Sequence, residues 1–267
     1  MPDVEAQGAA VRKPEISDFQ AQIGLTHHPG EMAATVRLME LAGIKSGERV
    51  LEVGCGAGIT AVILASFGCR VFALDRSERM VARTRQRLAR TGLVHRAHVR
   101  RGEVEELPYT SDGFDIVLGE AVLIQVQDRA RALRECRRVL RPGGVLALNE
   151  PTWLRSGPPL EVISWAHSAP DASGALAAPA WAALLADAGF ESQHVELCRI
   201  NPRTERLELF RRYGLKGILA AGIRQLELWM RSRDYRKYGK AARVKGPAPS
   251  AACDYLGYGL YICSKPA

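Results

Sequence analysis

The chain has 267 residues, of which 47% are hydrophobic and 25% are charged, which is the balance of an ordinary globular protein. This composition excludes a disordered, collagen-like or coiled-coil chain. No apolar run approaches the roughly 18 residues of a membrane span, and the N-terminus lacks the pattern of a secretion signal. The six cysteines are scattered without a Cys-x-x-Cys pair, which predicts no disulfide framework and no metal site. We therefore expect a cytoplasmic protein.

The net charge of +8 comes from one late segment. Residues 199–247 hold fourteen Lys or Arg against four Asp or Glu, so the rest of the chain is close to neutral. Such a segment fits recognition of an acidic substrate, a helix lying on anionic lipid, or a nucleic-acid surface. It also fits an ordinary solvated face, and the sequence leaves these alternatives open.

In chain order, strands alternate with helices. After a helix at 32–41, apolar runs predict strands at 50–53, 70–74, 98–100, 114–118 and 145–148, with helices at 59–67, 79–90 and 129–140 between them. Pro142, Gly143 and Gly144 indicate a turn. A helix at 179–188 and strands at 194–200 and 256–263 follow, separated by the basic, helix-patterned residues 203–245. Strands separated by helices predict parallel crossovers, covered on both faces of a doubly wound α/β sheet.

Glycines 54, 56 and 58 directly follow the first apolar strand. Glycine lets the backbone turn tightly and approach a ligand, and the next helix presents free N–H groups. The spacing is G-x-G-x-G rather than the G-x-G-x-x-G of dinucleotide-binding loops, and Glu52 places a carboxylate where a phosphate loop would avoid one. Asp75 ends the next strand, where a carboxylate can accept from both ribose hydroxyls. Together these residues predict a site for a cationic nucleoside without phosphate.

Five ordered motifs, over about half of the chain, resemble the class I S-adenosylmethionine-dependent methyltransferases, in particular the small-molecule branch that includes the menaquinone and ubiquinone C-methyltransferases. The motifs are VLEVGCGAG at 50–58, VFALD at 71–75, GEVEELPY at 102–109, FDIV at 114–117 and RVLRPGG at 138–144. With the predicted elements, the resemblance implies a Rossmann-like, mainly parallel seven-stranded sheet with an antiparallel last strand and a helical insertion.

The resemblance also implies S-adenosylmethionine as the cofactor. Glu52 and the glycines would lie against its methionine part, Asp75 at the ribose, and Glu103 at the adenine amino group, where the family usually has Asp. The implied cofactor-binding set is Glu52, Gly54, Cys55, Gly56, Gly58, Asp75, Arg76, Glu103, Val104 and Glu120.

Methyl transfer from a sulfonium needs alignment and exclusion of water, with a base only where the acceptor atom keeps a proton. Glu120 and Glu150 follow the fourth and fifth strands, at the edge where open α/β sheets bind ligands. His28, next to His27, lies in an N-terminal segment that relatives fold over the cofactor. We therefore take Glu120, Glu150 and His28 as catalytic candidates, with capping and ordinary solvation as the alternative.

We expect a flexible N-terminal cover at 1–29, a methyltransferase core at 30–202 and 250–267, and a basic helical cap at 203–249 between the last two strands. The cap's apolar residues are expected to cover the acceptor pocket while its arginines attract an acidic group. These apolar residues are Leu207, Phe210, Ile218, Ile223, Leu226 and Trp229.

The sequence thus predicts an enzyme that transfers a methyl group from S-adenosylmethionine to an O, N or C atom of a small-molecule acceptor, acidic or lipid-like, and releases S-adenosylhomocysteine. An RNA methyltransferase and a cofactor-binding protein without transfer activity are the alternatives. No appended RNA-binding module is visible, so a nucleic-acid partner is not favoured. Peripheral membrane contact through the basic cap stays open, and the sequence does not predict the oligomeric state.

Overall fold

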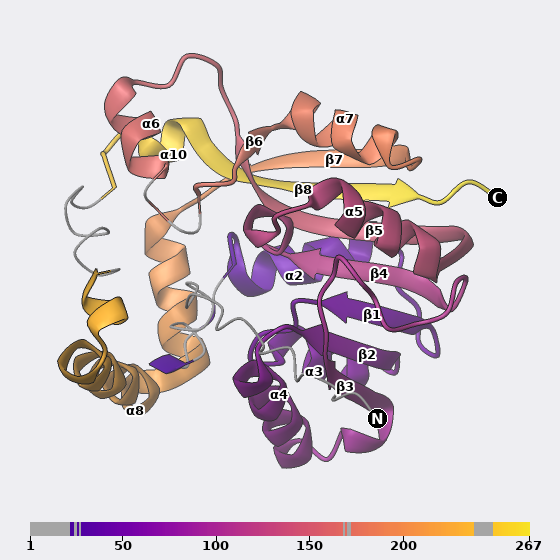
Figure 1. The fold of residues 1–267 in the computed structure, drawn as a ribbon, viewed down its shortest axis with the longest axis horizontal. Helices are drawn as coiled ribbons and strands as arrows, with labels where there is room; N and C mark the ends of the chain where they lie inside the picture. The colour runs from indigo at the N-terminus through magenta and orange to yellow at the C-terminus, as the bar shows by residue number, and fades with distance from the viewer. Residues whose placement is uncertain (1–21, 24–25, 27, 168, 170–171, 238–247) are drawn as a thin grey trace, which may run out of the picture.

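The computed structural model describes residues 22–23, 26, 28–167, 169, 172–237 and 248–267. At its centre lies an eight-stranded sheet with the order β3-β2-β1-β4-β5-β8-β7, and β6 pairs with β5 beside this path (Figure 1). The strands are β1 Arg49–Val53, β2 Arg70–Asp75, β3 Ala97–Arg101, β4 Phe114–Glu120, β5 Leu140–Trp153, β6 Leu176–Ala177, β7 Glu191–Arg199 and β8 Leu256–Ser264.

Helices cover both faces of this sheet. The helices of the chain are α2 Glu31–Leu41, α3 Ile59–Phe67, α4 Glu78–Arg90, α5 Arg129–Val139, α6 Leu160–Ala166, α7 Ala178–Asp187, α8 Pro202–Arg231 and α10 Ala252–Tyr255, with short 3-10 turns η1 Val94–Arg96 and η2 Leu123–Gln125. Those on the faces of the sheet are α2, α3, α4, α5 and α7. One core cluster contains Leu38, Leu64 and Leu88 from α2, α3 and α4. A second cluster contains Leu133 of α5 and Trp181 of α7. Burial of apolar side chains on both faces makes the sheet the middle layer of three.

The predicted fold class is confirmed. Strands β1 to β6 pair in parallel, whereas β8 runs antiparallel to both β5 and β7. The count of seven strands was one too low, because the two-residue β6 pairs with Thr152 and Trp153 of β5. A strand of two residues is too short to leave an alternating pattern in the sequence.

The turn expected at Pro142, Gly143 and Gly144 lies inside β5 instead. Leu140 already pairs with Phe114, and the register shifts before Val145 pairs with Ile116. Gly143 has φ +70°, a backbone conformation that glycine adopts without a steric penalty. The irregular stretch is held by hydrogen bonds between Gly143 N and Lys265 O and between Lys265 N and Gly144 O, both 2.9 Å long. The chain end beside β8 therefore keeps this segment in the sheet.

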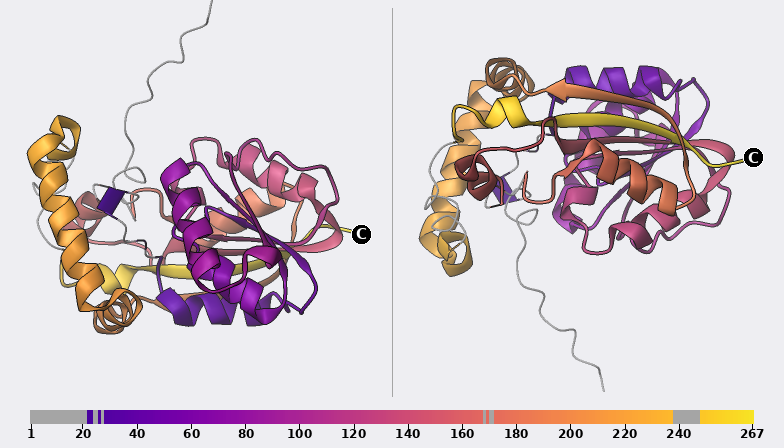
Figure 2. Two further views of the ribbon diagram at one scale, coloured as in Figure 1. Left: turned by 90° about the horizontal axis from the view of Figure 1, so that it is seen from below. Right: turned by 90° about the horizontal axis from the view of Figure 1, so that it is seen from above.

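Between β7 and β8 the chain forms α8, the main part of the predicted helical insertion. The Asn201 side chain accepts from Arg203 N at the helix start, and Pro202 occupies the first turn. Gly214 breaks the helix with φ 61° and ψ 174°. Figure 2 shows α8 at one end of the molecule, beyond the carboxyl ends of the parallel strands. In the described part of the chain, neither α8 nor any other helix combines the length and apolar character needed to cross a membrane.

Candidate active site

A pocket of about 390 Å³ opens at the carboxyl ends of β1, β2 and β4. On one side it is lined by the glycine turn after β1, the end of β2 and the loop after β3. On the other side it is lined by α6, the start of α8 and α10. The sequence-predicted residues in its lining are His28, Glu52, Gly54, Cys55, Gly56, Asp75, Arg76, Glu103, Val104 and Glu120.

The glycine turn serves two different purposes. Gly56 lines the pocket with φ +51°, where any side chain would be strained. Gly58 does not line the pocket. A Cβ at Gly58 would lie 2.7 Å from the Thr84 hydroxyl oxygen of α4, so this glycine permits close packing of the turn against that helix.

Two acidic side chains beside the glycine turn are buried. Glu52 is 4% exposed, and among the described residues its Oε2 atom has no hydrogen-bond partner. Burial, followed by the nearby carboxylates of Glu120 and Asp75, raises the pKa of Glu52 well above its usual range. Asp75 accepts hydrogen bonds from Gly56 N (2.9 Å) and Ser77 N (2.8 Å), and burial raises its pKa as well. Under-compensated carboxylates of this kind attract a ligand that carries positive charge and hydrogen-bond donors.

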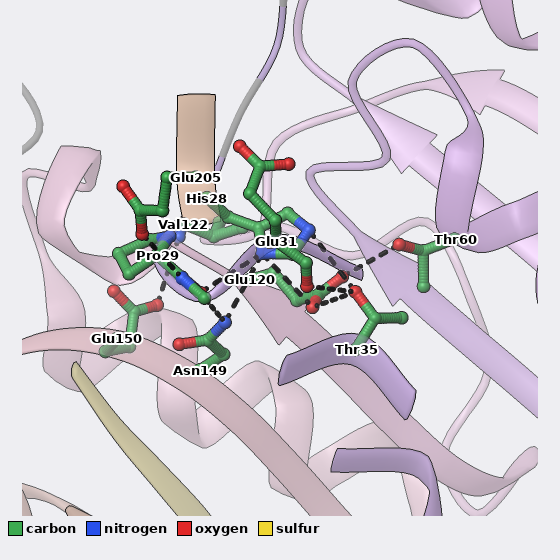
Figure 3. Close-up of polar contacts among 11 residues, drawn as sticks. His28, Pro29, Glu31, Thr35, Thr60, Glu120, Val122, Asn149, Glu150 and Glu205 are labelled. Carbon is green, nitrogen blue, oxygen red and sulfur yellow. Dashed lines mark hydrogen bonds and ion pairs between the residues drawn. The ribbon is translucent and has the colours of Figure 1, made fainter. Parts of the chain in front are cut away.

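Glu120 is held at the end of β4 by side chains from two helices (Figure 3). The hydroxyls of Thr35 and Thr60 donate to its two carboxylate oxygens, each over 2.8 Å. The Nδ1 atom of His28 lies 3.6 Å from Glu120 Oε1. Asn149 of β5 donates to Pro29 O over 2.9 Å and so fixes the segment that carries His28. The structure thus brings His28 and Glu120 together in the pocket wall, whereas His27 lies outside the described residues.

Glu150 does not line the pocket, contrary to the expectation that it faces the acceptor. Its fully buried carboxylate accepts from the backbone N–H groups of Val122 (3.0 Å), Leu123 (2.8 Å) and Ile124 (3.3 Å). Burial raises the pKa of Glu150 to about 7. The geometry gives this residue the structural role of holding η2 in place behind the pocket wall.

Two contacts that the sequence did not reveal join α8 to the N-terminal segment. Glu205 lines the pocket and accepts from Gly30 N over 3.0 Å. The Tyr213 hydroxyl accepts from Thr26 N (2.9 Å) and donates to Thr26 O (3.0 Å). These partners lie more than 170 residues apart in the chain, and no local pattern marks either of them.

The expectation that the apolar side chains of α8 cover the pocket is corrected by their exposure. Among the described side chains of this helix, only those of Pro202 and Glu205 line the pocket. Leu207, Phe210, Ile223, Leu226 and Trp229 are between 48% and 61% exposed. Ala221, which is 2% exposed, faces the rest of the protein instead. The large apolar side chains of α8 therefore point outward.

Residues 51–148 match a family model described as a methyltransferase domain. This part of the chain is a methyltransferase domain. A probable S-adenosylmethionine-dependent methyltransferase of Mycolicibacterium smegmatis is 37% identical over 113 residues, which is 42% of each chain. The protein spans about half the length of curated relatives that it matches, 55% and 42% in two cases.

Two solved structures share the overall fold of this chain. The cyclase SpnF has a TM-score of 0.70 at 22% identity, covering 94% of this chain and 93% of that one. A S-adenosylmethionine-dependent methyltransferase from Geobacter sulfurreducens, in complex with S-adenosylhomocysteine, has a TM-score of 0.68 at 21% identity, covering 92% and 96%.

The residues of the pocket fit the cofactor of this family. S-adenosylmethionine carries an ammonium group, a sulfonium and two ribose hydroxyls. The unpartnered Oε2 of Glu52 offers a buried acceptor for such a donor. Asp75 is fixed by two backbone N–H groups, and each of its oxygens keeps a lone pair for a hydroxyl.

Proposed function

We propose that this protein transfers a methyl group from S-adenosylmethionine to an O, N or C atom of a small-molecule acceptor, with S-adenosylhomocysteine as the second product. The observation that carries the proposal is the buried, unpartnered oxygen of Glu52 beside Asp75 in a pocket at the glycine turn. A volume of about 390 Å³ suits a nucleoside together with a small acceptor. The cofactor, when bound, supplies an activated methyl group.

We assign the contacts with each part of the cofactor from the positions of the residues that line the pocket. Glu52, Gly54 and Gly56 hold the methionine part, Asp75 accepts from the ribose hydroxyls, and Glu103 and Val104 border the adenine. Cys55 and Arg76 complete this side of the pocket. Gly58 contributes through the packing of α3 against α4 rather than by contact.

The acceptor side of the pocket favours a neutral or basic molecule over an acidic one. Its lining is mostly apolar, with Trp165, Ile200 and Leu256, and it carries the carboxylate of Glu205. In the described lining, Arg76 on the cofactor side is the only lysine or arginine. The described arginine side chains of α8, which we expected to attract an acidic acceptor, do not line it. We therefore propose an apolar acceptor whose reacting end carries no negative charge.

We further propose that His28 takes the acceptor's proton where the methylated atom carries one. Glu120 lies 3.6 Å from its imidazole, and a carboxylate at that distance stabilises the imidazolium that forms. The two threonine hydroxyls on Glu120 hold the carboxylate toward His28. Thr26, Pro29 and Glu205 line the pocket, and we assign to these residues the exclusion of water from the reacting atoms.

The test is calorimetric titration with S-adenosylhomocysteine, followed by measurement of its release from S-adenosylmethionine with a panel of apolar amines, alcohols and carboxylic acids. Gly56→Val should abolish binding. Gly43→Val is the matched control, because Gly43 also has a positive φ (+62°) but a Cβ there would meet nothing within 4 Å. Equal affinity of the Gly56→Val variant and the wild-type protein, both folded by circular dichroism, would refute the site.

One observation favours a second candidate. A protein of the same fold is named a cyclase, so the fold also occurs with another chemistry. A protein of this second kind would bind S-adenosylmethionine without consuming it. Persistence of bound S-adenosylmethionine through exhaustive acceptor trials would favour this candidate over methyl transfer.

A further inference from the structure

Helix α8 carries a continuous exposed apolar surface. Eight of the fourteen exposed large apolar side chains in the described chain belong to this one helix. Six of them follow the bend at Gly214, and apart from the adjacent Trp229 and Met230 they recur every three or four residues, so they lie along one side of the helix. We call these six the apolar stripe: Leu215, Leu219, Ile223, Leu226, Trp229 and Met230, each 48% to 61% exposed.

The opposite side of α8 is attached to the protein. Ala221 is buried, Arg224 donates to Ile23 O over 2.8 Å, and Tyr213 is bonded to Thr26. The apolar stripe therefore faces away from the core. Figures 1 and 2 both place α8 at one end of the molecule, where no described element lies beyond it. An exposed apolar surface of this extent in a folded protein marks an interaction site.

The charges around the stripe indicate what covers it. Residues 202–237 hold ten Lys or Arg against four Asp or Glu, and Lys216 and Arg231 of α8 are exposed. A second copy docked on the same surface would set two basic helices against each other. An anionic lipid surface compensates the charge while its acyl region accepts the apolar side chains, and Trp229 suits the boundary between them.

We propose that α8 docks this protein on anionic membrane surfaces, with the apolar stripe inserted at the level of the headgroups. The first turn of the same helix supplies Pro202 and Glu205 to the pocket. Docking would therefore bring the pocket next to the lipid. The docking depends on the surface of α8 alone and does not require methyl transfer.

The test is cosedimentation of the full chain with phosphatidylcholine vesicles, with and without phosphatidylserine. The wild-type protein should bind the anionic vesicles and be partly released by high salt. The triple variant Leu219→Ser/Ile223→Ser/Leu226→Ser should lose about tenfold or more in vesicle affinity. Lys216→Glu/Arg231→Glu should weaken binding and flatten its salt dependence.

Val36→Ser/Phe67→Ser/Val94→Ser is the matched control, because it removes three exposed apolar side chains outside α8 and should leave vesicle binding unchanged. Circular dichroism and S-adenosylhomocysteine affinity show whether both triple variants keep their fold. Three results would each overturn the proposal. The wild-type protein could fail to bind anionic vesicles. The stripe variant could bind them as tightly as the wild type does. Sedimentation velocity could show that the stripe holds a dimer together while no vesicle binding occurs.

Discussion

Glu52 combines a proposed role in ligand binding with a cost to the stability of the ligand-free fold. Its carboxylate is buried beside two others, which costs free energy in the ligand-free fold. In the proposed site the same carboxylate would offer the cofactor an acceptor that water does not compete for. Residues of this kind are expected at binding sites, where stability is lost in order to pre-form the site.

We predict that Glu52→Gln stabilises the ligand-free protein by about 1 kcal/mol, because the amide needs no charge in the buried site. The same change should weaken S-adenosylhomocysteine binding about tenfold or more, since a hydrogen bond to a charged group is lost. Thermal unfolding and calorimetry measure the two effects. A variant that is less stable and binds as well as the wild type would contradict the assignment.

The raised pKa of Glu150 predicts that the free energy of unfolding depends on pH. Its pKa in the folded protein, about 7, lies above the ordinary value of 4.5, so the folded state holds the proton more firmly than the unfolded chain. The contribution of this group to stability is therefore complete below about pH 4.5 and is lost as the pH rises toward 7. The loss amounts to about 3 kcal/mol at most.

Glu150→Gln should remove this part of the pH dependence. Urea unfolding between pH 5 and 7.5 measures it, with the exposed Glu161→Gln as control. If the stability of the wild-type protein changes with pH over this interval in the same way as that of the Glu150→Gln variant, the raised pKa is wrong.

At the scale of residues, sequence reasoning identified positions that line one pocket because the carboxyl ends of parallel strands meet at one edge. Asp75 and Glu120 are the last residues of β2 and β4, and Glu52 is the last but one of β1. Glu150 lies instead within β5, which continues to Trp153, and its carboxylate points toward the N–H groups of η2. Asn149, not Glu150, is in register with Glu120, and successive side chains of a strand point to opposite faces, so the register between β4 and β5 decides the direction of Glu150.

At the scale of elements, α3 and α4 meet at Gly58. A Cβ there would crowd the Thr84 hydroxyl and the Thr84 Cα at 2.8 Å, and the backbone has φ +76°. We predict that Gly58→Ala destabilises the fold by about 1–3 kcal/mol through overpacking and backbone strain. Denaturant unfolding checks this, and Gly43→Ala, strained without crowding, should cost less. Equal losses for both variants would show that packing plays no part.

The orientation of α8 was the element-level property that the sequence could not supply. Its apolar residues recur at helical spacing, and such a pattern ordinarily indicates the buried face. Here the helix attaches through the small Ala221 and through polar contacts such as Glu205 with Gly30, so the apolar side points outward. Which face of a helix is buried depends on segments far away in the chain.

At the scale of the whole molecule, the proposed cofactor side and the proposed acceptor side of the pocket come from different parts of the chain. The glycine turn and β2 supply the first, while α6, α8 and α10 supply the second. We predict that Glu205→Gln changes acceptor preference and leaves S-adenosylhomocysteine affinity within a few-fold. The matched control is Glu208→Gln, which lies on the same helix, pairs with Arg211 and does not line the pocket. Loss of cofactor affinity in Glu205→Gln alone would show that the two sides are not separate.

We infer above all that the acidic pocket at the glycine turn holds S-adenosylmethionine and not a dinucleotide. Isothermal titration of the full chain with S-adenosylmethionine and, separately, with NAD tests this most directly. We predict one S-adenosylmethionine bound per chain, with binding lost in Glu52→Ala/Asp75→Ala, and no binding of NAD, whose pyrophosphate these carboxylates would repel. Binding of NAD, or equal S-adenosylmethionine affinity in the folded double variant, would contradict it.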